Sequence, residues 1–155
     1  MHRIVPLLFA LSVAAAPAWA AERTGAARVL DGDTLEIAGE KIRLYGIDAP
    51  ELGQICRTRK GQDQQCGELA RQALVAVVEN QAVACKGDRR DPDGLLIAVC
   101  RIGWLDVGEK MVLDGWALAD PRDGKAYARA ENFAKARREG LWRTEFVAPW
   151  EWRRR

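Results

Sequence analysis

Four acidic side chains in the first half of the sequence could together hold a cation: Asp31, Asp33, Asp48 and Glu51. The first two lie between a first and a second expected strand, and the last two follow a third. In a meander, the ends of the first and third strands lie side by side, so we expect these acids to converge. Gathered carboxylates repel one another unless a cation lies among them, and their hard oxygen atoms favour Ca²⁺ or Mg²⁺.

An arginine belongs to the same neighbourhood, because Arg43 lies on the third expected strand, five residues before Asp48. A guanidinium grips phosphate oxygens with paired hydrogen bonds, and a nearby metal neutralises the charge that develops in phosphate chemistry. In the simpler interpretation, residues 31–33 form only a turn and Arg43 pairs with an acid. Taken alone, these residues favour that interpretation, since Asp-Gly turns are common.

Short strands joined by turns must position these side chains. Five segments have the composition or alternation of strands: 26–30, 34–38, 41–47, 81–86 and 95–102. Three have helical spacing or a glycine stop: 67–80, 107–114 and 127–139. Residues 52–65 show no period and are expected to form a loop. A helix after the third of five strands predicts a mainly β fold with helices (α+β), a five-stranded OB-fold β-barrel with about three helices.

The first 20 residues resemble an export signal. Arg3 precedes an almost wholly apolar run that is too short to span a bilayer comfortably, and Ala18-x-Ala20 has the pattern that signal peptidase cleaves. We expect cleavage there and a periplasmic or secreted protein without a membrane anchor, the alternative being an uncleaved anchor. The expected organisation has three parts: a signal peptide at 1–20, an OB-fold domain at 21–145, and a basic, Trp-rich C-terminal tail at 146–155.

The overall charge and composition limit the classes of function. With 48% hydrophobic and 30% charged residues, the chain has the balance of one globular domain, which argues against disorder. Removing the signal segment leaves 23 basic residues against 22 acidic ones. A chain this close to neutral does not bind nucleic acid by bulk charge, so any polyanion must be held by a local patch.

All four cysteines lie beyond the signal segment: Cys56, Cys66, Cys85 and Cys100. An even number in an exported chain indicates two disulfides, for which three pairings exist. Pairing Cys56 with Cys66 and Cys85 with Cys100 closes the shortest loops, and the second pair would join neighbouring strands. A zinc site is disfavoured because the chain has no Cys-x-x-Cys pair and its single histidine, His2, lies in the signal segment.

Two segments, residues 29–34 (Val-Leu-Asp-Gly-Asp-Thr) and residues 42–51 (Ile-Arg-Leu-Tyr-Gly-Ile-Asp-Ala-Pro-Glu), together resemble the staphylococcal nuclease family, or thermonucleases. The similarity continues in Gly67-Glu68-x-Ala70, in the turn at 91–94 and in later helices, and it covers nearly all of 26–142. It implies an OB-fold barrel with three helices that hydrolyses phosphodiesters of DNA and RNA with Ca²⁺.

The resemblance also implies roles for individual residues. The ligands of Ca²⁺ would be Asp33, Asp48 and the backbone carbonyl of Ala49. Glu51 would be the general base, taking a proton from the attacking water or at least ordering it. Arg43 would bind the phosphate and stabilise the transition state.

The chain departs from the family pattern at one charged position. The family has a second arginine directly after the glycine of the hairpin turn, whereas here Leu95 follows Gly94. Losing such a donor commonly costs about 3 kcal/mol or more, roughly a hundredfold or more in rate. Arg89 and Arg90, in the same turn, are candidate substitutes that would bind phosphate.

The leading prediction is thus an exported, Ca²⁺-dependent phosphodiesterase of DNA or RNA, monomeric and weakened by Leu95. The alternative is a catalytically impaired OB-fold protein that binds a phosphorylated or polyanionic partner in the cell envelope, and a third hypothesis is a structural or assembly factor of the envelope. In the tail, Trp150, Trp152 and three final arginines could stack and pair with nucleic acid. A frayed, solvated tail is the preferred expectation, since chain ends are commonly loose.

Overall fold

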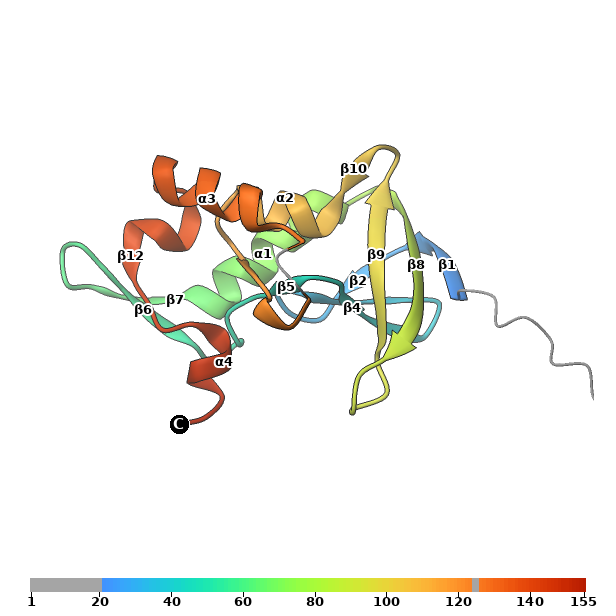
Figure 1. Cartoon of the computed structure of the whole chain (residues 1–155), viewed down its shortest axis with the longest axis horizontal. Helices are drawn as coiled ribbons and strands as arrows, with labels where there is room; N and C mark the ends of the chain where they lie inside the picture. Colours follow the sequence, from blue (N-terminus) through green and yellow to red (C-terminus); the bar gives the residue numbers. More distant parts are fainter. Residues whose placement is uncertain (1–20, 124–125) are drawn as a thin grey trace, which may run out of the picture.

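A curled sheet forms one half of the molecule (Figure 1). The computed structural model describes residues 21–123 and 126–155, so the expected signal peptide lies outside the described residues. The sheet contains β1 (Ala21–Ala26), β2 (Arg28–Val29), β3 (Thr34–Ile37), β4 (Glu40–Leu44), β8 (Ala82–Arg90), β9 (Leu96–Ile102) and β10 (Leu105–Asp106). Its order is β1-β8-β9-β4-β3-β2, with β10 paired to β9. Only β4 and β9 pair in parallel in this sheet; its other pairs are antiparallel.

Two helices cover the inner face of this sheet. The apolar positions of β3, β4 and β9 alternate inward, as the sequence pattern predicts, and include Leu35, Ile42 and Leu96. They pack with the buried stripe of α1 (Cys66–Val78) and with α2 (Val107–Leu113). The helix α3 (Ala128–Arg137) lies beyond α2. This α+β arrangement, a sheet curled into part of a barrel, confirms the predicted fold class.

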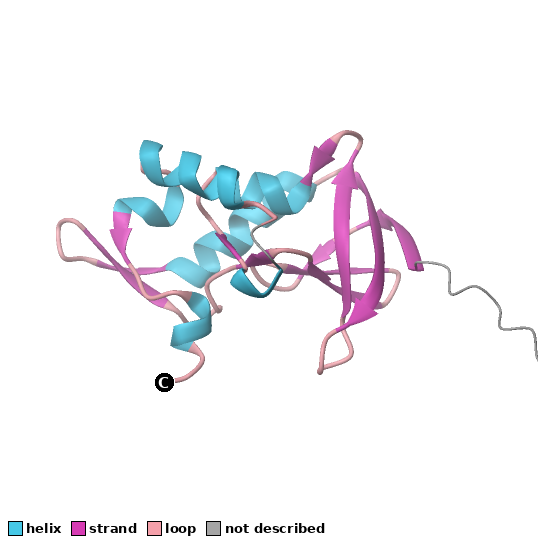
Figure 2. Cartoon of the chain, in the orientation of Figure 1, coloured by secondary structure: helices cyan, strands magenta, loops and turns pink. Residues whose placement is uncertain are grey.

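A smaller sheet forms the other end (Figure 2). Here β6 (Ile55–Thr58) pairs with β7 (Asp63–Gln65) and with β12 (Thr144–Glu145). The loop expected at 52–65 is therefore wrong, because most of this segment is a hairpin. The hairpin buries Cys56 but leaves the other residues of β6 and all of β7 largely accessible to solvent, so no apolar alternation marked its strands.

The C-terminal segment packs against the hairpin. After the short helix η2 (Gly140–Arg143) and β12, the chain forms α4 (Pro149–Trp152). A second apolar cluster joins Cys56, Cys66, Leu118 and Leu141 with Trp142, Phe146, Ala148 and Trp150. The expectation of a frayed tail is wrong, because this cluster holds the segment in place.

Two further short elements lie next to the acidic residues. The third expected strand ends early at Leu44, and the chain resumes as β5 (Ile47–Asp48), which pairs with β11 (Leu118–Ala119). The turn helix η1 (Pro121–Asp123) follows. None of the helices in the described part of the chain is long and apolar enough to cross a membrane.

Both disulfides have the pairing expected from the sequence. Cys85 and Cys100 face each other across β8 and β9, and Cys56 of β6 bonds to Cys66, the first residue of α1. The first bridge lies in the main core and the second lies in the smaller cluster. Each disulfide therefore fastens one of the two apolar clusters.

Candidate active site

The turn before β3 brings Asp33 to the segment that follows β5. The backbone N–H of Asp33 donates to Oδ1 of Asp31 (3.0 Å), which shapes the turn, and Oδ2 of Asp33 accepts from the backbone N–H of Ala49 (2.9 Å). Gly32 permits this approach, since a Cβ there would lie 2.7 Å from the Cβ of Ala49. The predicted convergence of the two segments is confirmed at this contact.

The carboxylate of Asp33 is buried among other charges. Burial raises its pKa to about 7, and the negative charge of Asp31 contributes in the same direction. The hydrogen bond from Ala49 and the charge of Arg43 oppose the shift. A bound cation would favour the ionised form, so this environment suits a carboxylate that ligates a metal.

Asp48 is fully buried and binds an arginine from the far end of the chain. Nη1 of Arg153 donates to Oδ1 of Asp48 (2.9 Å) and Nη2 donates to Oδ2 (2.6 Å). The side chain of Arg153 is 36% exposed, so its guanidinium extends from the surface to a buried acid. Such a fork is the strongest ordinary pairing of arginine with a carboxylate.

Glu51 shares the same guanidinium. Its Oε1 accepts from Nη1 of Arg153 at 2.6 Å, and its side chain is 41% exposed. The start of α1 packs on its backbone, where a side chain at Gly67 would collide with the Glu51 carbonyl. The Glu51 carboxylate is therefore accessible to solvent, while its backbone is held against a helix.

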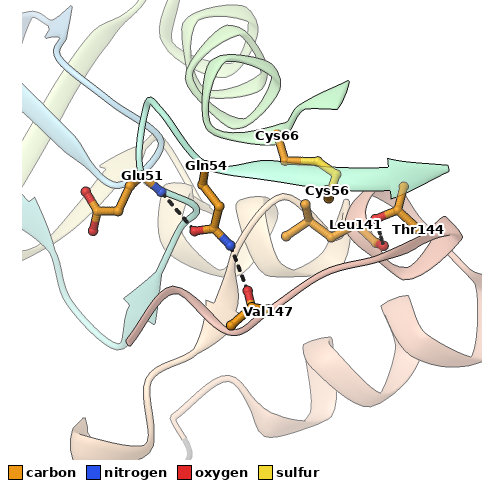
Figure 3. The surroundings of a disulfide bond; sticks show 7 residues. All are labelled: Glu51, Gln54, Cys56, Cys66, Leu141, Thr144 and Val147. Atoms are coloured by element: carbon orange, nitrogen blue, oxygen red, sulfur yellow. Dashed lines mark hydrogen bonds between the residues drawn. A yellow bond between two sulfur atoms is a disulfide. The ribbon is translucent and has the colours of Figure 1, made fainter. Parts of the chain in front are cut away.

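The buried side-chain amide of Gln54 holds the backbone of Glu51. Oε1 of Gln54 accepts from the backbone N–H of Glu51 (3.3 Å), and Nε2 donates to the carbonyl oxygen of Val147 (2.7 Å). Figure 3 shows this amide between the two segments, with the Glu51 carboxylate turned away from it and the Cys56–Cys66 bridge nearby. Gln54 thus connects the Glu51 loop to the C-terminal segment.

Arg43 lies in the middle of β4, where it pairs in register with Thr34 of β3 and Ile97 of β9. Its positive charge lowers the pKa of Asp33 and also that of Asp120, which follows β11. Arg43 therefore belongs to the same electrostatic neighbourhood as the predicted metal ligands. The sequence predicted this placement from the meander alone.

A second acid–arginine pair borders the site. Asp120 is buried, and Arg122 donates to both of its oxygens, at 3.0 Å through Nε and 2.6 Å through Nη2. Burial opposes ionisation, yet these hydrogen bonds hold the pKa of Asp120 below its usual value. The negative charge of Asp120 is therefore balanced by its neighbour Arg122.

The two candidate substitutes for the missing arginine point in different directions. Arg89 shares a row with Arg43, because both pair with Ile97, so the two side chains leave the same face of the sheet. Its guanidinium donates to Asp123 (3.1 Å) and lies 5.9 Å from the ring centre of Tyr45.

Arg90, the next residue, alternates to the other face. It donates to Glu40 (2.7 Å) and to the carbonyl of Gly94 (2.8 Å). Leu95 directly precedes β9, and extending the alternation of that strand by one residue puts position 95 on the face of Ile97, the side of Arg43. The leucine leaves that position without a charge.

The oxygen atoms around Asp33 and Asp48 fit a hard divalent cation. Within residues 21–123 and 126–155, no three acidic, histidine or cysteine side chains cluster closely enough to hold a metal by themselves. The predicted ligand set instead has two carboxylates and the carbonyl of Ala49. Two observations support this fit. The donor atoms are all oxygen, and the buried carboxylate of Asp48 already interacts with a positive group, the guanidinium of Arg153.

Sequence reasoning missed three residues of this site: Gln54, Arg122 and Arg153. Gln54 is a single amide in a segment without periodicity. Arg122 lies in a short segment whose sequence has no distinctive pattern. The run of arginines after two tryptophans was a signal for Arg153, but a distant ion pair leaves no local pattern.

Comparison with known proteins identifies the family. A model described as staphylococcal nuclease homologue matches residues 41–144, a range that contains Arg43, Asp48 and Glu51. This chain belongs to the staphylococcal nuclease family. Its membership confirms the resemblance seen in the sequence motifs.

The similar proteins in this family carry names that refer to different roles. The succinoglycan biosynthesis protein ExoI of Rhizobium meliloti (strain 1021) is 37% identical over 124 residues, covering 78% of this chain but only 65% of that protein. Protein ParB of Escherichia coli is 33% identical, covering 94% of this chain and 86% of the relative. The micrococcal nuclease of Shigella flexneri is 30% identical, covering 92% of this chain and 86% of the relative.

Proposed function

We propose that this staphylococcal nuclease family member is an exported, Ca²⁺-dependent phosphodiesterase that hydrolyses DNA or RNA. One observation carries the proposal: the turn at Asp33, the backbone of Ala49 and the pair Asp48 and Glu51 meet in one place. Oδ2 of Asp33 accepts a hydrogen bond from the backbone N–H of Ala49 at 2.9 Å. Asp48 and Glu51 both accept hydrogen bonds from the guanidinium of Arg153. Carboxylates repel one another, so acids that only shaped a surface turn would not be expected to lie this close together.

The metal would be held by Asp33, Asp48 and the carbonyl oxygen of Ala49. When bound, Ca²⁺ would polarise the phosphate and neutralise the charge that develops on it. The donor set is entirely oxygen, as Ca²⁺ prefers. Both carboxylates are buried, so their charges interact strongly with a cation.

The chain's own residues would perform the remaining steps. Glu51 lies at the solvent opening, where it would orient the attacking water and accept its proton. Arg43 would bind the phosphate oxygens and stabilise the extra negative charge of the transition state. Arg89 would add positive charge on the same face of the sheet, whereas Arg90 is turned toward Glu40.

The substrate would be a nucleic acid, bound by a local cluster of arginines and not by net charge. Arg43, Arg122 and Arg153 surround the acids, while the whole chain is nearly neutral. The Shigella relative is named a nuclease, which supports this substrate class. We propose a monomer as the active unit.

Export is supported by the covalent structure. Two disulfides persist in oxidising compartments and are rare in the cytosol. Together with the signal-like segment at 1–20, they favour the periplasm or the medium as the site of action. Cleavage after Ala20 would leave the protein without a membrane anchor.

A second candidate function is binding without efficient catalysis. Leu95 removes a donor from the face of Arg43, and Glu51 is hydrogen-bonded to an arginine. A protein with this site could grip a phosphorylated or polyanionic partner and cleave it slowly. The name of the Rhizobium relative refers to biosynthesis and not to nuclease activity, which agrees with a diversity of roles.

The decisive experiment is a digest of single-stranded DNA and of RNA with Ca²⁺, with EDTA, and with the Glu51→Gln variant. We expect Ca²⁺-dependent cleavage that EDTA and Glu51→Gln abolish. Glu79→Gln, an exposed acid at the end of α1, is the matched control and should cleave like the wild type. Wild-type cleavage no greater than that of Glu51→Gln would reject the enzyme and leave the binding function.

A further inference from the structure

The arginine that grips Asp48 and Glu51 is not assigned a role by any of the family motifs. We propose that Arg153 is the second phosphate-binding arginine of the site, supplied by the C-terminal segment in place of residue 95. This inference rests on the proposed function, because it assigns a residue to the same phosphodiester site. It extends the site from the barrel to a helix more than 100 residues away in sequence.

The C-terminal segment holds Arg153 in a defined position. Ala148, which precedes α4, and Trp150, within it, pack in the second apolar cluster, and the carbonyl of Val147 accepts a hydrogen bond from buried Gln54. The backbone N–H of Arg153 donates to the carbonyl of Pro149, which caps the helix. The guanidinium is therefore presented by an anchored element, as a positioned phosphate ligand requires.

The hydrogen bonds to the acids leave a second fork of the guanidinium available. Both N–H groups of Nη1 are used, one by Asp48 and one by Glu51, and Nη2 uses one N–H for Asp48. Among the described residues, neither Nε nor the remaining N–H of Nη2 has a partner. These two donors lie on one edge of the planar group and match two phosphate oxygens.

The side chains of Arg153 and Glu51 are partly open to solvent, so a phosphate can reach this part of the site. The side chains of Arg153 and Glu51 are 36% and 41% exposed, whereas Asp48 is fully buried. The free edge, formed by Nε and Nη2, lies across the guanidinium from Glu51, which bonds to Nη1, so a phosphate bound there would lie beside the group that holds both acids. The acids behind it would hold the guanidinium in orientation while it binds.

Arg89 and Arg90 are less well placed for this role. The hydrogen bonds of Arg89 go to Asp123, and those of Arg90 go to Glu40 and Gly94. Among the described residues, neither has a hydrogen bond or ion pair with Asp33, Asp48 or Glu51. Arg153 is the arginine with direct bonds to both the predicted base and a predicted metal ligand.

A competing interpretation makes the opposite prediction. If Arg153 only filled the place of the metal, removing it would free Asp48 and Glu51 for Ca²⁺, and both Ca²⁺ affinity and cleavage would increase. If Arg153 binds phosphate, its removal must weaken substrate binding and slow cleavage. One variant therefore separates the two.

The test compares wild type with Arg153→Ala, Arg153→Lys and Arg154→Ala. The last variant changes an exposed neighbour and should behave as wild type. The measurements are kcat and KM on a short single-stranded oligonucleotide, Kd for its uncleaved phosphorothioate analogue with Ca²⁺, and Kd for Ca²⁺ by calorimetry. Because Arg153→Ala leaves Asp48 without its partner, thermal melting monitors folding, and Arg153→Lys keeps a positive charge but loses the second fork.

We expect Arg153→Ala to lower kcat about a hundredfold and to raise the Kd of the analogue about tenfold. Arg153→Lys should remain folded and lose most of the activity, and millimolar guanidinium should restore part of it to Arg153→Ala. Unchanged or higher activity in both Arg153 variants would overturn the inference even if Glu51→Gln is inactive. If wild type cleaves nothing, the nuclease proposal fails, and the inference is then decided by whether Arg153→Ala weakens binding of the analogue.

Discussion

The side-chain amide of Gln54 donates to the carbonyl oxygen of Val147 at 2.7 Å and so connects the loop of the predicted base to the C-terminal segment. The same amide accepts from the backbone N–H of Glu51. One buried residue thereby holds two parts of the site that are far apart in sequence. Any motion of the C-terminal segment should be transmitted to Glu51 through it.

Replacing Gln54 should affect both stability and catalysis. Gln54→Ala leaves the Glu51 N–H and the Val147 carbonyl without their partner, and we expect a loss of about 1–3 kcal/mol in the free energy of unfolding. The value of kcat should fall because the base is displaced, and KM should rise because the segment that presents Arg153 loses an anchor. Urea denaturation and steady-state kinetics measure the two effects, with exposed Gln62→Ala as the control. Wild-type kinetics for Gln54→Ala would show that Glu51 needs no such support.

Arg153 and position 95 should be able to replace each other. Leu95→Arg restores a guanidinium on the face of Arg43, so it should add little to wild type but recover activity in the double variant Leu95→Arg/Arg153→Ala. Leu95→Lys is the matched control and should recover less, since an ammonium lacks the planar fork. The readout is kcat of the single and double variants. Equal gains from Leu95→Arg with and without Arg153 would show that the two act independently.

Calcium binding should distinguish Asp33 from its neighbour Asp31. Asp33→Ala removes a predicted ligand and should weaken Ca²⁺ binding by tenfold or more in calorimetric titration, on the order of 1.4 kcal/mol. Asp31→Asn keeps the acceptor for the backbone N–H of Asp33 and should retain binding within severalfold. Equal affinity in wild type and Asp33→Ala would mean that the buried carboxylates serve only the turn.

The two disulfides should contribute differently. Removing either bridge with paired Cys→Ala changes should lower stability by about 2–4 kcal/mol. Loss of Cys56–Cys66 should also lower kcat, because this bridge fastens the hairpin and α1 beside the Glu51 loop (Figure 3). Loss of Cys85–Cys100, which lies in the barrel core, should leave kcat nearly unchanged below the melting temperature. Kinetics and thermal melts of the two double variants test this difference.

The sequence predicted well the parts of the fold that depend on local patterns. The strands around Leu35 and Ile42 alternate, the turn residues of 31–33 are distinctive, and short connections allow only a meander. That topology predicted that the acids of 31–33 and of 48–51 converge, and the contact between Asp33 and Ala49 agrees with it. The motifs then identified Arg43, Asp48 and Glu51 as a set.

The remaining features depend on contacts between distant segments, which leave little local pattern. The hairpin at 55–65 buries Cys56 and exposes its other residues, so it has no periodicity to detect. Arg153 looks like one of several solvated arginines until the second apolar cluster brings it to Asp48. Gln54 acquires its importance from two backbone groups, and no side-chain pattern indicates it.

The bridge between Cys56 and Cys66 has a consequence for the cell that makes this protein. If the protein is exported as proposed, its thiols would stay reduced in the cytosol and become paired only after transport. A newly made chain would then lack the bond that fastens α1 and the hairpin beside Glu51 while it is still among the cell's own nucleic acids. We expect the reduced protein to be the less active form, so that oxidation after transport would protect the producing cell from self-digestion.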